Sequence, residues 1–327
     1  MNSKVVKAIL TKKHCDFAGS IGDEEIRKII DKKSVVTGGC IASLLLKETV
    51  NDFDYYLTDK ESVLKVAKYF VAEFNRLHPP KPNDATEPPY VYVEKNGEVC
   101  KDETDFDRVR IMVKSAGIIG EKTDESQYQY FEGRPLEEGE DYVRQAIGEV
   151  LEDADSLDGE KIDDLAKAKY RPVFLTDNAI TLSNKIQIII RFYGDADKIH
   201  ENYDYVHCTN YWESGSRSLV LKQAALESLL AKELKYIGSK YPICSLVRMR
   251  KFINRGWFIN AGQILKISFQ ISELNLSDIK VLEDQLTGVD TAYFIQIIDN
   301  LRQKQSEDNT FTIAMPYLTT ILDRLFG

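Results

Sequence analysis

The sequence predicts an α+β protein, in which a mixed region of strands and helices is followed by an all-helical C-terminal domain. Short β-branched and aromatic runs alternate with helical patterns as far as residue 213, whereas the patterns beyond it are helical. A length of 327 residues suits two domains, because single domains commonly span about 100–200 residues. The composition is that of a folded protein, since 43% of the residues are hydrophobic.

The first part of the chain predicts two strands flanked by helices. Ile26, Ile29 and Ile30 fall at helical spacing, and the acids before them suit the first turn of a helix. A β-branched run then ends at the pair Gly38-Gly39. The expected order is a helix over 23–32, a strand over 34–37, a glycine turn, a helix over 40–48, a strand over 52–57 and, after a capping box of Thr58 and Glu61, a helix over 62–78.

Residues 81–170 are predicted to be an acidic insertion in a loop of the first domain. They hold 24 acids and 12 bases, a net charge of −12, whereas the rest of the chain carries +3 and the whole chain −9. Proline-rich sequence over 78–89 ends the preceding helix. Strand-like pieces and a helix-like piece over 140–154 follow. A regulatory lid, a nucleic-acid mimic and a solubilising elaboration are all compatible with this composition.

Strand patterns resume after the insertion. Runs over 172–176, 179–183 and 185–193 predict strands, 194–202 predicts a short acid-capped helix, and 203–212 predicts a further strand. The predicted domains are a core in two halves, 1–80 and 171–213, the acidic insertion 81–170 between them, and a helical domain over 214–327.

A basic segment opens the predicted helical domain. Residues 214–266 hold ten bases and two acids. Within it, RMRKFINRGW gathers arginines and lysines near Trp257, a combination suited to phosphate contacts and base stacking. Arg248 and Lys251 are therefore candidate phosphate ligands. The alternative is a solvated helix face, which basic helices commonly are.

Several classes of protein are excluded by composition. No apolar run approaches the ~20 residues of a membrane span, and the first residues lack the apolar region of a signal peptide. We therefore expect a soluble cytoplasmic protein with no membrane partner. Five scattered cysteines without a C-x-x-C pair predict neither a disulfide framework nor a cysteine zinc site.

The informative motif is GGCIASLLLKETVNDFDYY, in which Gly38-Gly39 is followed after twelve residues by Asp52-x-Asp54. Side chains alternate along a strand, so carboxylates two residues apart project from one face and can share divalent cations. A glycine turn before a helix lets phosphate groups approach exposed N–H groups. The alternative is an ordinary strand–turn–helix with two surface acids.

This motif resembles the DNA polymerase β-like nucleotidyltransferase superfamily. The interval matches its tRNA nucleotidyltransferase and bacterial poly(A) polymerase branch, but Ala42 and Ser43 replace an Arg-Asp pair and Lys47 replaces a glycine. The segment 178–212 is similar to phage- and large-virus-encoded nucleotidyltransferase-like proteins. The resemblance implies a mixed sheet with helices on one side, and location in the cytoplasm of a bacterial host if the protein is phage-encoded.

The resemblance also implies the residues of an active site. The predicted metal ligands and catalytic residues are Asp52, Asp54 and Asp204, of which Asp204 lies on the strand predicted over 203–212. They would bind Mg²⁺ or Mn²⁺ and carry the catalysis. Gly38, Gly39 and Ser43 would bind the NTP, with ATP favoured, together with Arg248 and Lys251. Asp204 could instead cap a turn.

The main functional hypothesis is an Mg²⁺-dependent nucleotidyltransferase that moves an NMP from an NTP to an acceptor hydroxyl. The acceptor would be an RNA 3′ end, such as that of tRNA, or a protein. The alternative hypothesis is a catalytically idle protein of the same fold that binds or inhibits a protein partner, with the acidic insertion as its contact surface. A small-molecule nucleotidyltransferase is a third possibility.

Overall fold

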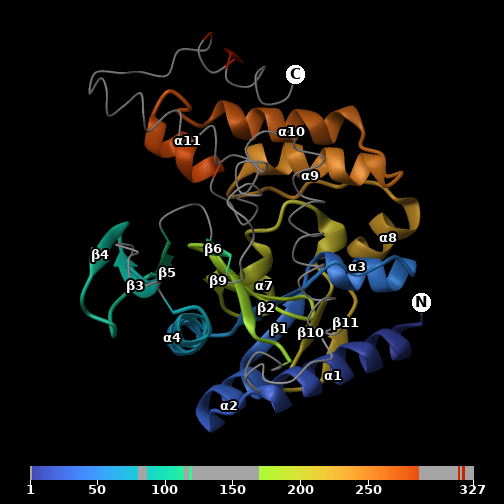
Figure 1. Cartoon of the computed structure of the whole chain (residues 1–327). Helices are drawn as coiled ribbons and strands as arrows, with labels where there is room; N and C mark the ends of the chain where they lie inside the picture. The colour runs from blue at the N-terminus through green and yellow to red at the C-terminus, as the bar shows by residue number, and fades with distance from the viewer. Residues whose placement is uncertain are drawn as a thin grey trace. The chain divides into compact units, whose positions relative to one another are not determined.

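The computed structural model describes residues 2–79, 87–113, 118–119 and 169–286, together with residues 316, 319 and 320. These residues belong to two compact units, the first ending at Ile237 and the second beginning at Gly238. Figure 1 labels their helices and strands. Within the described ranges, no helix has the length and apolar character needed to cross a membrane.

The first unit is built on an eight-stranded mixed sheet. The strand order is β11-β10-β1-β2-β9-β8-β7-β6, and among the central strands β2 and β9 run parallel whereas β1 and β8 are antiparallel to their neighbours. The strands predicted over 172–193 are confirmed. The bounds are β1 (Ser34–Thr37), β2 (Phe53–Leu57), β6 (Ile118–Ile119), β7 (Pro172–Leu175), β8 (Ala179–Leu182), β9 (Ile186–Tyr193), β10 (Tyr211–Glu213) and β11 (Ser218–Val220).

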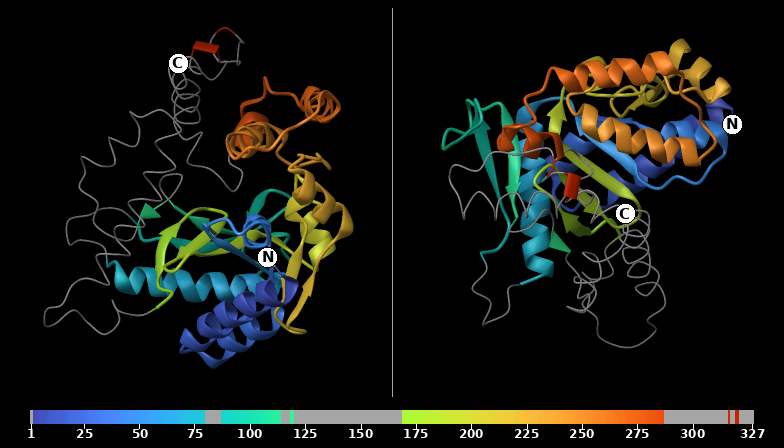
Figure 2. Two further views of the ribbon diagram at one scale, coloured as in Figure 1. Left: turned by 90° about the vertical axis from the view of Figure 1, so that its right-hand side faces the viewer. Right: turned by 90° about the horizontal axis from the view of Figure 1, so that it is seen from above.

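Helices of the first unit pack against this sheet. In Figure 2, α1, α2 and α4 lie together on one side of the strands. The long helix α4 contacts β2, β7 and β9, so it supports the centre of the sheet. The helices are α1 (Ser3–Ser20), α2 (Glu24–Lys33), α3 (Gly39–Leu46), α4 (Lys60–Leu77), α7 (Ala196–His200) and α8 (Gln223–Ala231), with a 3₁₀ helix η1 (Val206–Cys208).

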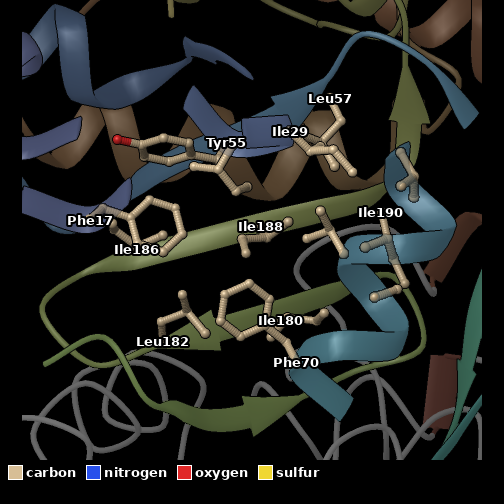
Figure 3. Close-up of a cluster of buried hydrophobic side chains, with 14 of the residues drawn as sticks. Phe17, Ile29, Tyr55, Leu57, Phe70, Ile180, Leu182, Ile186, Ile188 and Ile190 are labelled. Carbon is tan, nitrogen blue, oxygen red and sulfur yellow. The ribbon is translucent and has the colours of Figure 1, made fainter. Parts of the chain in front are cut away.

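The hydrophobic core lies between the sheet and these helices. Figure 3 shows side chains from α1, α2 and α4 meeting those of β2, β8 and β9. Ile186, Ile188 and Ile190 of β9 are fully buried, as is expected of a central strand covered by neighbours. Burial of such side chains stabilises a fold by about 1.5–3 kcal/mol each. The core therefore fixes the position of β2, which carries the candidate site.

Local sequence explains where the helices begin. Asp23 caps α2 by accepting a hydrogen bond from the N–H of Ile26, at 2.9 Å. The helix α4 begins at Lys60 with Asp59 as its cap, so the predicted capping role of Thr58 was wrong by one residue. Sequence reasoning did not identify α1, although two signals were available. Asn2 caps the helix, and the apolar residues Val6, Leu10 and Phe17, which are buried, recur at helical spacing.

Part of the predicted acidic insertion forms a second, three-stranded sheet. Strands β3 (Tyr90–Lys95), β4 (Glu98–Cys100) and β5 (Arg108–Met112) follow the order β4-β3-β5. Arg110 joins this sheet to the β7–β8 turn, because its guanidinium donates to Glu94 Oε1 at 3.0 Å and to Asp177 Oδ2 at 2.6 Å. This part is therefore integral to the first unit. The helix predicted over 140–154 lies outside the described residues.

The boundary of the helical region differs from the prediction of residue 214. The strand β11 pairs with β10 and completes one edge of the main sheet, and α8 contacts η1. Both elements therefore belong to the first unit, which ends at Ile237. A helix is present within this segment, as α8, but a helix pattern does not show which core the helix covers.

The described part of the second unit is helical. It contains α9 (Pro242–Asn254), α10 (Ala261–Ser272) and α11 (Ile279–Leu286), and α9 packs against the other two. Side-chain amides connect them to the chain before α9: Gln270 Nε2 donates to Ser239 O at 2.7 Å, and Gln285 Nε2 donates to Lys240 O at 2.9 Å.

Candidate functional site

The turn between β1 and α3 has a backbone conformation that requires glycine. Gly38 has φ 92° and ψ −153°, and its N–H donates to the carbonyl oxygen of Cys208 at 3.1 Å. A Cβ atom at Gly38 would lie 2.9 Å from Asp54 Oδ2 and 3.4 Å from the hydroxyl of Tyr203. Gly39 differs, because nothing lies within 4 Å of the position of its missing Cβ.

Asp54 projects from β2 beside this turn. It lies opposite Thr37 in the antiparallel β1–β2 register, so the end of β1 and the start of β2 form one edge of the sheet. Asp52 comes just before the strand. Burial raises the pKa of the Cys40 thiol well above its usual value, and the charges of Asp54 and Asp52 raise it further. The charges of both carboxylates therefore act on the thiol in the first turn of α3.

A tyrosine pair closes one side of Asp54. The hydroxyl of Tyr203 donates to that of Tyr56 at 3.2 Å. Burial raises the pKa of Tyr203 well above its usual value, and Tyr56 and the charge of Asp54 contribute. Sequence reasoning missed Tyr203 because its contact with the glycine turn joins residues that are far apart in the chain.

A hydrogen-bonded network fixes the end of β1. Thr37 Oγ1 lies 2.8 Å from His200 Nε2 and donates to Asn210 O at 2.9 Å. The ammonium of Lys222 lies 3.2 Å from His200 Nδ1, and since an ammonium only donates, the imidazole proton lies on Nε2. Burial and the charge of Lys222 lower the pKa of His200 to about 4, against the opposite effect of Asp197. His200 is therefore a neutral positioning residue at neutral pH.

Asp204 does not lie on a strand, which corrects the prediction for 203–212. It occupies a bend before η1, and only Tyr211 onward pairs in the sheet. Its carbonyl oxygen accepts from the N–H of Ile237 at 2.9 Å, and its side chain is buried. Tyr205 forms an isolated bridge to Tyr236, which turns this segment toward α8 instead of the sheet.

The predicted metal ligands do not form a three-residue site. Across the part of the chain that the structure describes, which includes Asp52, Asp54 and Asp204, no group of three or more His, Cys, Asp or Glu side chains is arranged to hold a metal ion. Among the described residues there is thus no preformed three-carboxylate group, and no reaction step is assigned to a metal.

The other predicted nucleotide ligands are dispersed. Ser43 lies within α3 and is buried, with its carbonyl oxygen accepting from the N–H of Glu48 at 2.9 Å. Arg248 and Lys251 lie on α9 and belong to the second unit, whereas Gly38 belongs to the first. The structure thus places Gly38 and Asp54 together and assigns the two bases to a separate unit.

The bases of the basic segment are divided between the two units. The boundary after Ile237 falls within this segment. In the first unit, Arg217 pairs with Asp31, Lys222 with Asp197 at 2.7 Å and Lys232 with Glu48 at 3.5 Å. In the second, Trp257 is buried and its ring centroid lies 5.5 Å from that of Phe252, so its ring packs against α9.

Comparison with known proteins identifies the family. A family model described as Gabija anti-defense 2 family protein matches residues 8–232. The chain belongs to the Gabija anti-defense 2 family. A curated relative, "Gabija anti-defense 2" of Bacillus phage SPbetaL7, is 24% identical over 107 residues, which cover 32% of this chain and 27% of the relative. The alignment thus spans about a quarter of that relative. No solved structure matches the chain.

The Gabija anti-defense 2 match covers the candidate site. Residues 8–232 include Gly38, Asp52, Asp54 and Asp204, whereas Arg248 and Lys251 lie beyond the matched region. A phage-encoded relative agrees with the predicted likeness to phage proteins.

Proposed function

We propose that this protein counteracts the Gabija defence of a bacterial host on behalf of a phage, by binding a protein of that defence in the host cytoplasm. The observation that carries the proposal is the family model match over residues 8–232. The phage origin of the relative supports it. In this function the first unit supplies a folded surface that binds the partner. The hypothesis of an inhibitory protein, given above as the alternative, thus becomes the main functional hypothesis.

The direct test is phage plating on bacteria that carry the Gabija system. Cells that also express this chain should support plaques in numbers close to those on cells without the system, and the chain should co-purify with a tagged Gabija protein. If the Gabija system still protected the cells fully from phage while the chain was stably expressed, the proposed activity would be contradicted. Plating rescue without any co-purified partner would contradict the binding mechanism alone.

A second candidate function is nucleotidyl transfer, which the arrangement of Gly38 and Asp54 favours. The glycine has no side chain and lies against a strand carboxylate at a helix start, a place where phosphate groups can approach N–H donors. Each α-labelled NTP would be incubated with the purified chain, Mg²⁺ or Mn²⁺, and host RNA or protein extract. This activity would be supported if the wild type and Asp105→Asn both transferred label and Asp54→Asn did not.

The same two variants separate the two functions in cells. Asp105 lies in the connection between β4 and β5 and is an exposed partner of Lys95, so Asp105→Asn is a matched carboxylate-to-amide control. If binding alone inhibits the defence, Asp54→Asn should still rescue plating. If nucleotidyl transfer is the mechanism, Asp54→Asn should lose rescue while the amount of folded protein stays unchanged.

A further inference from the structure

Two lysines, Lys13 and Lys169, lie over the ring of Tyr170 in the first unit, and a third, Lys185, follows Asn184, whose carbonyl oxygen accepts a hydrogen bond from Lys13. Lys13 lies on α1, Lys169 precedes β7, and Lys185 lies in the turn between β8 and β9. The Nζ atoms of Lys13 and Lys169 lie 5.0 and 5.4 Å from the centroid of the Tyr170 ring. Lys13 Nζ also lies 5.3 Å from the centroid of Phe53. The lysine cluster thus draws on three separate segments of chain.

Backbone contacts hold these amines in place. Lys13 Nζ donates to Asn184 O at 2.5 Å, and Lys185 Nζ donates to Val50 O at 3.1 Å. Asn184 and Lys185 both have φ of 60°, in the left-handed region, within the three-residue turn between Leu182 and Ile186. Each of these two ammonium groups has three N–H donors, so it can donate to a ligand in addition to these backbone oxygens.

Tyr170 adds a strained position to the cluster. It has φ 66°, a conformation that is unfavourable for a bulky aromatic residue, and its side chain is only 4% exposed. Packing against Phe17, at 5.3 Å between ring centroids, holds the ring in the core. Such strain persists only where the surroundings impose it, and it is concentrated at functional positions.

The charge balance of the cluster is unfavourable without an anion. Burial, together with the charges of Lys169 and Lys185, lowers the pKa of Lys13 to about 8. Among the described residues, the acid that opposes this effect is Asp16, which lies 3.6 Å from Lys169. Three amines therefore face one carboxylate, and a bound anion would relieve their repulsion.

The lysine cluster is distinct from the glycine turn. Phe53 and Asp54 are consecutive on β2, so their side chains point to opposite faces of the sheet. Phe53 packs in the core and lies beside Lys13, whereas Asp54 lies beside Gly38 on the other face. An anion bound by the lysines would therefore occupy a site of its own.

We propose that Lys13, Lys169 and Lys185 form a binding site for a small phosphate-bearing ligand. The amines would donate charge-assisted hydrogen bonds to its phosphate oxygens, and Tyr170 would form the apolar floor between them. The site goes beyond the proposed anti-defence function and does not depend on nucleotidyl transfer. Inorganic phosphate, pyrophosphate and ATP share this chemistry and are the probes that distinguish a phosphate site from a nucleotide site.

Thermal unfolding and calorimetry of the full chain test the proposal, with NaCl matched for ionic strength. Pyrophosphate should raise the Tm saturably, and Lys13→Met or Lys185→Asn should weaken its binding about tenfold or more. Asn suits the left-handed backbone at position 185, so this variant keeps the turn intact. Lys12→Met, an exposed neighbour on α1, is the matched control and should bind like the wild type.

Proton uptake provides a second readout that a general salt effect would not give. Because Lys13 is largely neutral above pH 8, anion binding at pH 8.5 should take up a fraction of a proton, which calorimetry in two buffers measures. Lys13→Met should abolish the uptake. No saturable binding of any probe, or equal losses in Lys12→Met and Lys13→Met, would overturn the proposal. ATP binding tighter than pyrophosphate would identify the ligand as a nucleotide.

Discussion

The carboxylate of Asp54 stands directly against Gly38, so that a Cβ atom at residue 38 would lie 2.9 Å from Asp54 Oδ2. The glycine turn and the β2 carboxylate are therefore one structural unit, and neither position can change without affecting the other. This relationship gives the candidate site its clearest stability test.

Gly38→Ala should destabilise the protein by about 2–3 kcal/mol, because the substitution combines an unfavourable backbone conformation with a steric contact. Gly39→Ala should change stability by less than about 1 kcal/mol, since its Cβ would meet nothing within 4 Å. Urea unfolding measures both. The double variant Gly38→Ala/Asp54→Ala should recover part of the loss by removing the contact; equal costs at the two glycines would contradict this account.

The stability of the protein should fall between pH 6.5 and pH 4. Burial and the charge of Arg217 lower the pKa of His14 to about 4, with Asp31 opposing them. The unfolded chain then binds a proton in this window that the folded chain does not, so unfolding becomes easier as pH decreases. For His14 the loss from pH 6.5 to 5 should be about 1.5 kcal/mol.

His14→Phe should remove this contribution while keeping the contacts with Tyr55 and Trp212, whose ring centroids lie 5.9 and 4.9 Å away. Urea unfolding at pH 7 and pH 5 gives the difference. His200 should also make the free energy of unfolding fall as pH decreases. Lys222→Met should reduce the contribution of His200, because loss of the lysine charge raises the pKa of His200. An unchanged pH dependence in His14→Phe would show that this imidazole is not the group responsible.

Arg110→Met should destabilise the first unit by about 3 kcal/mol, because it removes the closest charged partner of the buried Glu94. Adding Glu94→Gln should restore part of the loss. Hydrogen exchange should show the opening in β3 and β5. Arg76→Met, which removes an exposed pair with Glu73, is the control and should cost less than about 1 kcal/mol.

Thiol labelling of the native protein should be selective. Cys15 is exposed and should react with iodoacetamide, whereas burial and the nearby carboxylates raise the pKa of Cys40 and should protect it. Mass spectrometry after timed quenching measures both rates. Asp54→Asn should increase the rate at Cys40 only modestly, because burial is the larger effect; rapid labelling of Cys40 in the wild type would contradict its placement.

Local patterns predicted much of the first unit because strands and glycine turns are encoded nearby in the sequence. The β1–turn–α3–β2 order and the strands over 172–193 follow from β-branched runs and glycine. The segment around Asp204 was misread because its aromatic residues suit a strand, yet Tyr205 bridges Tyr236 and redirects the chain. The ion pairs of Arg217 and Lys232 join distant segments, so charge counting could not reveal them.

The parallel neighbours β2 and β9 place a constraint on synthesis of this protein. β2 ends at Leu57 and its partner begins at Ile186, about 130 residues later. At ~5–20 residues per second, one edge of β2 waits roughly 6 to 26 s on the ribosome for its partner. During that interval the aromatic strand β2 lacks its neighbour β9. We therefore expect nascent chains to rely on chaperones, and we expect the yield of folded protein to respond strongly to growth temperature.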